Sequence, residues 1–318
     1  MKSSDSMSGF NGAKFCWMNG EVIATNKALV SAMEPIHLGI FEGIKAYLEG
    51  DLMGEGKQNI FAWDKHVARL FRSAKVNGLQ MPYTKEQLLE AAKEAIKANE
   101  FISNVYLQPR IWPKAGASRS KPESHVVIPA WEMSTLLGSG NPAFTRERRF
   151  IVSSWRRIAS DALPPQAKSW ANYGNSGLAE RESRCLGYDG AVLLDNRGFV
   201  SESTGACLMI VKDCVVTSPP VTASILESVT RDFLLKYLPV DVGIETEIHD
   251  LTRLDLYASE EAFLCGTGGE ITPITSIDDI KIGETYPGPL TTRIHDYYSR
   301  VVSGRIEKRC NWLTPVWS

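Results

Sequence analysis

Residues 190–211 read GAVLLDNRGFVSESTGACLMIV, and this stretch decides the predicted fold. Its two apolar ends, 190–194 and 207–211, have the composition of buried strands, and NRG at 196–198 is typical of a tight turn between strands. The surrounding chain continues the mixture, with strands expected at 149–155, 243–248 and 261–265 and helices near 174–187, 225–237 and 288–302. Because helices and strands are mixed without strict alternation, the sequence predicts an α+β fold rather than a doubly wound parallel sheet.

The earlier part of the chain carries its own structural signals. Asn19-Gly20 between two short apolar runs predicts a β-hairpin. Asp64 is expected to cap one helix, and TKEQ at 84–87 is the capping box of a second helix. Further strands are expected to follow at 104–112 and 125–131.

Residues 137–147, LGSGNPAFTRE, are rich in Gly, Pro and Asn and form the expected linker between two domains. The sequence thus predicts a smaller α+β domain over 1–136 and a larger α+β domain over 148–318. A length of 318 residues fits two domains of ordinary size.

The composition argues against several classes of function. Lys and Arg number 35 and Asp and Glu number 37, so the formal net charge of −2 supplies no field to hold a nucleic acid. No apolar run is long enough to cross a bilayer, and residues 1–12 lack the apolar core of a secretion signal. The six cysteines and five histidines are dispersed without the spacing of a metal site. We therefore expect a cytoplasmic protein with no metal, no nucleic-acid partner and no membrane partner.

The stretch 164–173, PPQAKSWANY, places a single lysine, Lys168, in an uncharged and partly aromatic surrounding before a predicted helix. A desolvated lysine has a lowered pKa and can form a Schiff base with an aldehyde cofactor. The alternative is a plain surface lysine in a loop, which is a common arrangement. The spacing alone leaves both interpretations open.

Three further stretches have the composition to hold an anion or a flat ring. In 198–206, Glu202 lies in an apolar strand before small residues, and a buried carboxylate needs a partner such as a pyridinium nitrogen. Residues 224–232 begin a helix whose backbone N–H groups and Thr230 hydroxyl form an anion site. Residues 265–270 end a strand in a Gly-rich turn whose amides form a nest for a carboxylate. The alternatives are an exposed turn carboxylate, a plain capping box from Ser224 to Glu227, and a bend without a ligand.

The order and spacing of these stretches resemble the branched-chain amino acid aminotransferases, within the class IV, D-amino-acid-transaminase-like group of pyridoxal-phosphate enzymes. The resemblance covers nearly the whole chain. Its most specific pieces are FEGIKAY at 41–47, SSWRR at 153–157, AK at 167–168 with NY at 172–173, SE at 201–202, TRD at 230–232, and GT at 266–267 with EITP at 270–273. The resemblance implies the two-domain fold of fold type IV, whose larger pseudo-barrel domain carries the cofactor lysine. It also implies a homodimer or higher homo-oligomer.

The resemblance further implies pyridoxal 5'-phosphate as the cofactor and assigns its contacts. Lys168 would be the catalytic residue, which forms the Schiff base and shuttles the proton. Glu202 would pair with the pyridine nitrogen, and Tyr173 would hydrogen-bond the cofactor's O3′. The remaining cofactor contacts would be Arg69, Val229, Thr230 and Thr267.

The same resemblance assigns the substrate side. The backbone amides of Thr267 and Gly268 would bind the substrate carboxylate. The pocket would be lined by Phe41, Tyr106, Gln108, Arg110 and Trp131.

This chain departs from the family pattern on the substrate side, whereas the cofactor side follows it. The family commonly has an Arg at the position of Gln108, which reads the side-chain carboxylate of glutamate, and an Arg at the position of Lys45. A neutral amide cannot give the charge-assisted, bidentate contact that an Arg gives to a carboxylate. We therefore expect this chain to prefer hydrophobic amino acids and to handle glutamate weakly.

The sequence thus predicts a pyridoxal-phosphate-dependent aminotransferase. It would move an amino group between a hydrophobic, branched-chain-like L-amino acid and a 2-oxo acid, which are its small-molecule partners. One alternative keeps the cofactor and changes the reaction: a fold-type IV transaminase of D-amino acids or R-amines, or an aminodeoxychorismate-type lyase. Another alternative is a non-catalytic binding protein of the same fold, against which the intact Lys168 and Glu202 argue.

Overall fold

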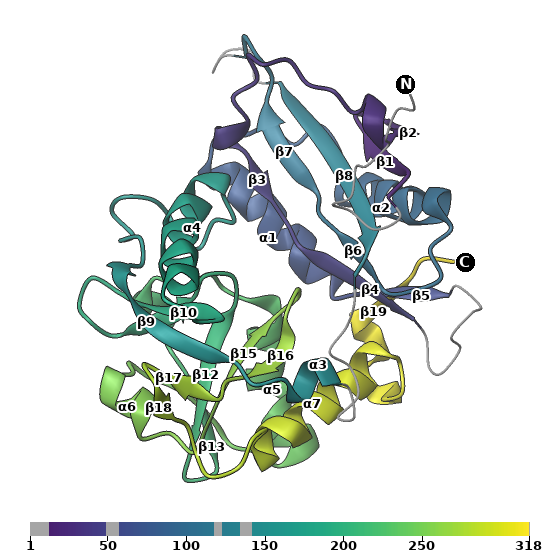
Figure 1. Ribbon diagram of the computed structural model, residues 1–318. Coiled ribbons are helices and arrows are strands. Elements are labelled where there is room, and N and C mark those ends of the chain that lie inside the picture. Colours follow the sequence, from purple (N-terminus) through teal and green to yellow (C-terminus); the bar gives the residue numbers. More distant parts are fainter. Residues whose placement is uncertain (1–12, 49–56, 118–122, 134–141, 318) are drawn as a thin grey trace, which may run out of the picture. The chain divides into compact units, whose positions relative to one another are not determined.

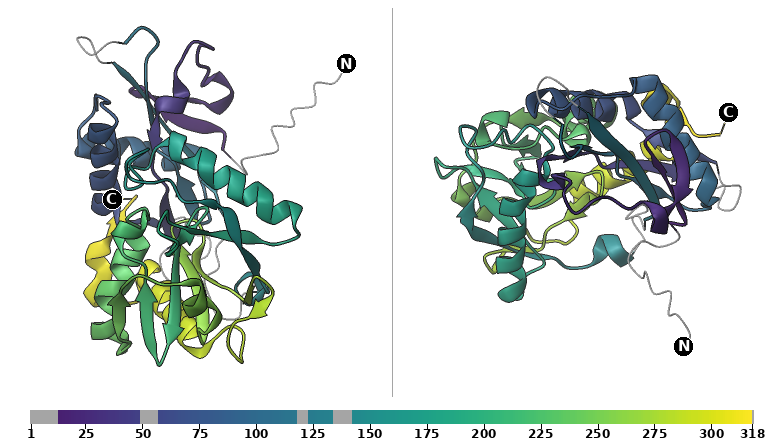
Figure 2. Two further views of the ribbon diagram at one scale, coloured as in Figure 1. Left: turned by 90° about the vertical axis from the view of Figure 1, so that its left-hand side faces the viewer. Right: turned by 90° about the horizontal axis from the view of Figure 1, so that it is seen from above.

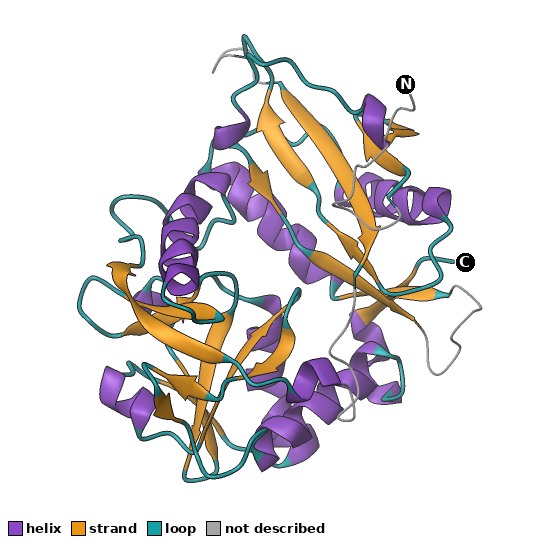
Figure 3. Ribbon diagram, in the orientation of Figure 1, coloured by secondary structure: helices purple, strands orange, loops and turns teal. Residues whose placement is uncertain are grey.

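The computed structural model describes residues 13–48, 57–117, 123–133 and 142–317 (Figure 1). These residues mix helices and strands, as the α+β prediction requires (Figure 3). The chain divides into two compact units: unit 1 is Met1–Ser134 with Val302–Ser318, and unit 2 is Thr135–Val301. None of the helices in the described ranges combines the length and the apolar character that a bilayer span needs.

Unit 1 is built on a sheet that carries two helices on one face. Its described strands are β1 (Phe15–Met18), β2 (Glu21–Ala24), β3 (Ile40–Phe41), β4 (Ile44–Leu48), β5 (Gln58–Phe61), β6 (Val105–Leu107), β7 (Arg110–Pro113), β8 (Ser124–Glu132) and β19 (Leu313–Pro315). The helices are α1 (Trp63–Val76) and α2 (Lys85–Asn99), which Figure 2 shows from two further directions. The apolar side chains between helices and sheet form the core of this unit, which includes Ile44, Ile60, Leu70, Ala92, Leu107 and Ile128.

The structure confirms two of the local predictions for unit 1 and contradicts a third. β1 and β2 pair antiparallel around Asn19 and Gly20, both at positive φ, which confirms the predicted hairpin. Thr84 and Gln87 form the predicted capping box at the start of α2. The cap predicted at Asp64 is wrong, because α1 begins at Trp63 and leaves Asp64 inside its first turn.

The strand predicted over 104–112 is two strands, β6 and β7. Pro109 has no N–H to donate to the hydrogen bonds of the sheet, and the strand is interrupted there. The amide of Gln108 still donates to the carbonyl of Pro129 at 3.1 Å, so the break does not detach this segment from β8.

The C-terminal segment changes the expected division of the chain. The sequence assigned all of 148–318 to the larger domain, whereas residues from Val302 onward group with unit 1. The reason is that β19 pairs antiparallel with β5 and that Val316 is fully buried in the core of unit 1. The expected linker 137–147 falls partly outside the described residues, which resume at α3 (Pro142–Thr145).

Unit 2 contains two sheets in its described residues. One has the order β11-β10-β9-β17-β18 and the other the order β14-β13-β12-β15-β16. The strands of the first are β9 (Arg149–Arg156), β10 (Gly190–Leu194), β11 (Val200–Ser203), β17 (Ser276–Ile277) and β18 (Ile280–Lys281). The strands of the second are β12 (Cys207–Lys212), β13 (Val215–Ser218), β14 (Thr246–Ile248), β15 (Glu261–Gly266) and β16 (Glu270–Pro273). The longer helices are α4 (Trp170–Cys185), α5 (Val229–Tyr237) and α7 (Pro289–Val302), and α6 (Arg253–Tyr257) is short.

Most elements predicted in this unit are present, and two begin later than expected. The turn at 196–198 joins β10 to β11, which confirms the interpretation of the stretch 190–211. The strand predicted over 243–248 is reduced to β14. The helix predicted from 225 begins at Val229, because Ser224 has a positive φ of 61° and Ser228 is the residue that caps α5. The capping box from Ser224 to Glu227 is therefore wrong.

Candidate active site

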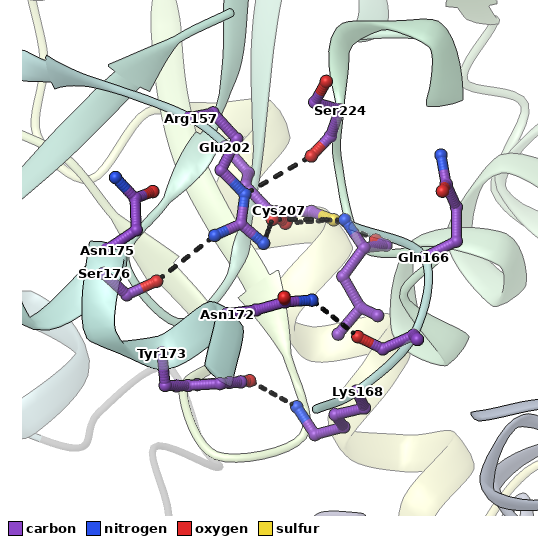
Figure 4. Close-up of polar contacts among 12 residues, drawn as sticks. Arg157, Gln166, Lys168, Asn172, Tyr173, Asn175, Ser176, Glu202, Cys207 and Ser224 are labelled. Carbon is purple, nitrogen blue, oxygen red and sulfur yellow. Dashed lines mark hydrogen bonds and ion pairs between the residues drawn. The ribbon is translucent and has the colours of Figure 1, made fainter. Parts of the chain in front are cut away.

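The loop before α4 holds Lys168 out of solvent. Only 9% of Lys168 is exposed, and its Nζ atom donates a 2.6 Å hydrogen bond to the hydroxyl of Tyr173 (Figure 4). The side chain of Asn172 braces the loop, since its Nδ2 atom donates to the carbonyls of Pro164 and Ala167 at 3.0 and 2.9 Å. Lys168 is therefore a buried, oriented amine, and the alternative of a solvated loop lysine is wrong.

Glu202 is a buried carboxylate on β11. It is 5% exposed, and its Oε1 atom accepts hydrogen bonds from Arg157 Nη2 at 2.8 Å and from the amide of Leu226 at 3.1 Å. Its Oε2 atom lies 3.9 Å from the Sγ atom of Cys207 (Figure 4). The alternative of an exposed turn carboxylate is wrong.

Arg157 joins the surroundings of Glu202 to helix α4, and the sequence analysis assigned it no role. The guanidinium is 6% exposed and donates through Nη1 to Ser176 Oγ and through Nε to the carbonyl of Ser224, both at 3.3 Å. Ser176 lies one helical turn after Tyr173 on α4, so this helix contacts both the lysine and the Arg157–Glu202 pair. The signal that pointed to Arg157 was the SSWRR motif, whose last residue it is.

Two thiols beside this pair stay protonated. Burial, and then the negative charge of Glu202, raise the pKa of Cys207 well above its usual value. Burial raises the pKa of its cross-strand partner Cys265 to about 12. Arg231 lowers the pKa of both, but less than burial raises it. Neither thiol adds a second negative charge near Glu202 at neutral pH.

The start of α5 supplies a possible anion site in the same unit. Val229 and Thr230 are the first two residues of this helix, and both are buried. The N-terminus of a nine-residue helix directs backbone N–H groups and a positive partial charge outward. Thr267 and Gly268 lie in the turn that joins β15 to β16, where they are half-buried.

Arg69, the expected phosphate ligand, lies on α1 in unit 1. Its Nε and Nη2 atoms donate to Glu42 Oε1 and Oε2 at 2.7 and 2.8 Å, and His66 Nδ1 lies 2.9 Å from Glu42 Oε2. Burial of Glu42 opposes its ionisation, but Arg69 and His66 outweigh burial and lower the pKa of Glu42 to about 2. The geometry shows a rigid guanidinium, and the contact with phosphate stays a prediction.

The residues expected to line the substrate pocket share one face of the unit 1 sheet. Val105, Leu107 and Ile111 pack into the core beneath the helices, so the residues between them face the other way. On that opposite face Tyr106 pairs with Lys45 and Trp131 across the strands, and its ring lies 5.0 Å from that of Trp131.

The same face carries the residues that depart from the family pattern. Arg110 is the strand partner of Phe41, and its Nε atom donates to Gln108 Oε1 at 2.8 Å. Burial lowers the pKa of Arg110, although an arginine stays charged at neutral pH. Gln108 and Arg110 thus act as one hydrogen-bonded unit, which the sequence pattern did not reveal.

Three comparisons place this arrangement among known proteins. The family model described as Amino-transferase class IV matches residues 39–277. The branched-chain-amino-acid aminotransferase of Escherichia coli (strain K12) is 34% identical over 318 residues, covering 96% of this chain and 98% of that protein. The branched-chain amino acid aminotransferase of Thermobaculum terrenum in its PLP form (holo-form) has a TM-score of 0.89 at 33% identity, covering 97% of this chain and 100% of that chain. The branched-chain aminotransferase of Thermoproteus uzoniensis with norvaline has a TM-score of 0.87 at 36% identity, covering 96% and 100%.

These matches span both units and include the segments that carry Lys168 and Glu202. They agree with the fold type that the sequence motifs predicted. The chain therefore belongs to the branched-chain amino acid aminotransferase family, the class IV aminotransferases of fold type IV, which depend on pyridoxal phosphate.

Proposed function

We propose that this protein transfers an amino group between a hydrophobic, branched-chain-like L-amino acid and a 2-oxo acid. The observation that carries the proposal is the buried Lys168 amine, which is bonded to Tyr173 in the unit that also buries the Arg157–Glu202 pair. An oriented amine and a buried carboxylate are the groups that amino-group chemistry on pyridoxal phosphate requires.

The donor set fits pyridoxal phosphate. The cofactor has an aldehyde, a ring hydroxyl, a ring nitrogen and a phosphate, and unit 2 offers a matching group for each. These are the amine of Lys168, the phenol of Tyr173, the carboxylate of Glu202 and the α5 N-terminus at Val229 and Thr230. When bound, the cofactor supplies an aldehyde that condenses with amines and a ring that withdraws electrons.

Lys168 is the residue that transfers the proton in this proposal. Its Nζ atom would hold the cofactor through the aldehyde. When it is not engaged in that bond, the amine would take the proton from the substrate α-carbon and return it. Tyr173 fixes the position of the Lys168 Nζ atom, because its hydroxyl accepts a 2.6 Å hydrogen bond from that atom.

Glu202 would hold the ring nitrogen of the cofactor and stabilise a proton on it. A carboxylate that is buried and paired with Arg157 stays fixed, so it presents a negative charge at a constant position. A protonated ring nitrogen makes the ring a better electron acceptor. Arg69 and Thr267 complete the cofactor contacts in the proposal, with Arg69 held by Glu42.

The substrate side is proposed to bind an apolar side chain. Thr267 and Gly268 offer backbone amides to the substrate carboxylate, while Phe41, Tyr106 and Trp131 supply aromatic walls. The relative from Thermoproteus uzoniensis was solved with norvaline, an amino acid with an apolar side chain. Gln108, with its carbonyl engaged by Arg110, offers no positive charge of its own to a glutamate side chain.

We further propose a cytoplasmic homodimer whose larger domain carries the cofactor lysine. All six cysteines are free thiols, as is usual in a reducing compartment. In unit 1, Leu29 and Met33 are 80% and 79% exposed, which favours burial of this segment against a second copy of the chain.

A half-reaction tests the proposal. Purified protein loaded with pyridoxal phosphate is mixed with leucine, and absorbance follows conversion to the pyridoxamine form. Reduction with borohydride before peptide mapping should fix the cofactor to Lys168, and Lys168→Ala should show neither adduct nor conversion. Lys281→Ala, an exposed lysine, is the control. Attachment at another lysine, or repeated turnover of leucine without a 2-oxo acid acceptor as in a lyase, would contradict the proposal.

A further inference from the structure

We propose that Arg157 is a positioning residue that keeps the Glu202 carboxylate ionised and fixed, so that the proton between Glu202 and its ligand resides on the ligand. The inference rests on the proposed function, in which that ligand is the ring nitrogen of pyridoxal phosphate. It adds to that function a residue that acts on the cofactor through Glu202 alone.

The burial of the pair requires a cation at this position. Glu202 and Arg157 are each almost fully buried, and 2.8 Å separates Nη2 of Arg157 from Oε1 of Glu202. A buried carboxylate with no cation beside it takes up a proton, because the charged form is poorly solvated there. The permanent charge of an arginine removes that tendency at any working pH.

Arg157 is itself held in three directions. Its backbone amide donates to the carbonyl of Leu194 at 2.8 Å, which anchors the residue at the end of β9. Its Nη1 and Nε atoms donate to Ser176 Oγ and to the carbonyl of Ser224. The guanidinium therefore cannot swing away from Glu202 without losing several buried hydrogen bonds, and it acts as a fixed charge (Figure 4).

The other groups around Glu202 leave its charge in place. The amide of Leu226 donates to the same Oε1 atom, and Cys207 on β12 faces Oε2. Burial, followed by the charge of Glu202, raises the pKa of Cys207, so this thiol stays neutral. Cys265 on β15 and Arg231 on α5 act on Cys207 rather than bonding to Glu202.

The position of Arg157 decides where the proton resides. Its charge lies against Oε1, so it stabilises the carboxylate more strongly than it repels a cation bound beyond the carboxylate. The state with an ionised Glu202 and a protonated ligand is thereby favoured over the state in which both are neutral.

The first experiment measures Glu202 without the cofactor. Infrared difference spectra of the apo protein report the protonated carboxyl group across pH. We expect Arg157→Met to show a protonated Glu202 near neutral pH, and Arg157→Lys, which keeps the charge, to show an ionised one. Arg156→Met removes the same charge from the exposed neighbouring residue and is the matched control. An ionised Glu202 in Arg157→Met at neutral pH would overturn the inference.

The second experiment measures the protonation of the ligand's ring nitrogen. The NMR chemical shift of the ring nitrogen in isotope-labelled pyridoxal phosphate reports its protonation in the holoenzyme. Arg157→Met should lose the protonated signal and slow the leucine half-reaction at least tenfold, whereas Arg157→Lys should stay within about threefold of the parent. A purely structural role for Arg157 would lower cofactor affinity in both variants and leave the signal unmoved, which would also overturn the inference.

The two proposals fail in different ways. If Arg157→Met protonates Glu202 in the apo protein but leaves the ring nitrogen unchanged, Glu202 does not face that nitrogen, and its role in the proposed function is wrong. If Arg157→Lys has no folded form, Ser176→Ala loosens the guanidinium while it keeps the charge, and Glu202 should remain ionised in that variant.

Discussion

The amine of Lys168 and the phenol of Tyr173 are joined by a 2.6 Å hydrogen bond across the first turn of α4. The helix fixes this relationship, because Tyr173 is its fourth residue and Lys168 lies two residues before its start. Asn172 braces the loop that leads to Lys168 by donating to two of its carbonyls, those of Pro164 and Ala167. The adjoining helix thus supplies a side chain that orients the amine.

Tyr173→Phe should slow the half-reaction about tenfold, because the variant removes one hydrogen bond to the reacting amine and leaves the ring in place. Single-turnover absorbance with leucine measures the rate. Tyr188→Phe removes a hydroxyl that bonds to Asp279 at the surface and serves as the control. Equal rates for Tyr173→Phe and the parent protein would show that the bond does not aim Nζ during turnover.

Glu202→Gln should fold with reduced stability, and its half-reaction should be about 10- to 100-fold slower. The neutral amide leaves the buried guanidinium of Arg157 without its counter-charge, which costs roughly 3 kcal/mol of unfolding free energy. The loss of a charge-assisted hydrogen bond, about 1.5–3 kcal/mol, sets the rate effect. Urea unfolding and half-reaction rates measure the two effects. Glu90→Gln, which breaks a surface pair with Lys93, should change neither, and an unchanged rate in Glu202→Gln would remove Glu202 from the site.

Stability in acid should depend on Glu42. Burial opposes ionisation of Glu42, but Arg69 and His66 lower its pKa from 4.5 to about 2. A carboxyl group with a depressed pKa stabilises the folded state above its unfolded pKa, and this contribution is lost as the pH falls from 4.5 towards 2. The loss should reach roughly 3 kcal/mol, measured by urea unfolding at a series of pH values. Glu42→Gln should flatten that slope, and an equally steep slope in the variant would contradict the assignment.

Glutamate should be a slower amino donor than leucine, isoleucine or valine. Gln108 stands where the family commonly carries an arginine, and its side-chain carbonyl oxygen accepts a hydrogen bond from Arg110 at the start of β7. The comparison of half-reaction rates for these donors checks the expectation. Gln108→Arg should raise the rate with glutamate several-fold and leave the rate with leucine nearly unchanged.

Arg110 provides the complementary test of the same pocket. If glutamate reacts as fast as the best hydrophobic donor, the preference for hydrophobic donors is wrong, and Arg110 has taken over recognition of the distal carboxylate. Arg110→Ala should then raise the apparent dissociation constant for glutamate selectively. The contact between the rings of Tyr106 and Trp131 should be the same in Gln108→Arg and in Arg110→Ala.

The features that the sequence predicted well depend on local interactions. The hairpin at Asn19-Gly20 and the capping box at Thr84 are decided within four residues, and the structure has both. The cap predicted at Asp64 is wrong because Ala62, in a left-handed conformation, is the N-cap and α1 starts two residues earlier than expected. That conformation is held by a hydrogen bond from the Ala62 amide to the carbonyl of Trp312, which no local pattern encodes.

The candidate site shows the same limit. Lys168 and Tyr173 are five residues apart, so a short motif contains both. Arg157 and Glu202 are 45 residues apart, and they meet only because β9 and β10 run parallel and β11 returns beside β10. The SSWRR and SE motifs contain one residue each, but their pairing follows from the strand order, which the sequence pattern left undetermined.

The pairing of β19 with β5 has a consequence for biosynthesis. Residues 313–315 leave the ribosome after every strand of unit 2, so the edge of the unit 1 sheet at β5 stays uncovered throughout translation of unit 2. An N-terminal unit ordinarily folds first as a nascent chain emerges, and here it lacks one strand until elongation has passed that point. Unit 1 closes last, although most of it is synthesised first.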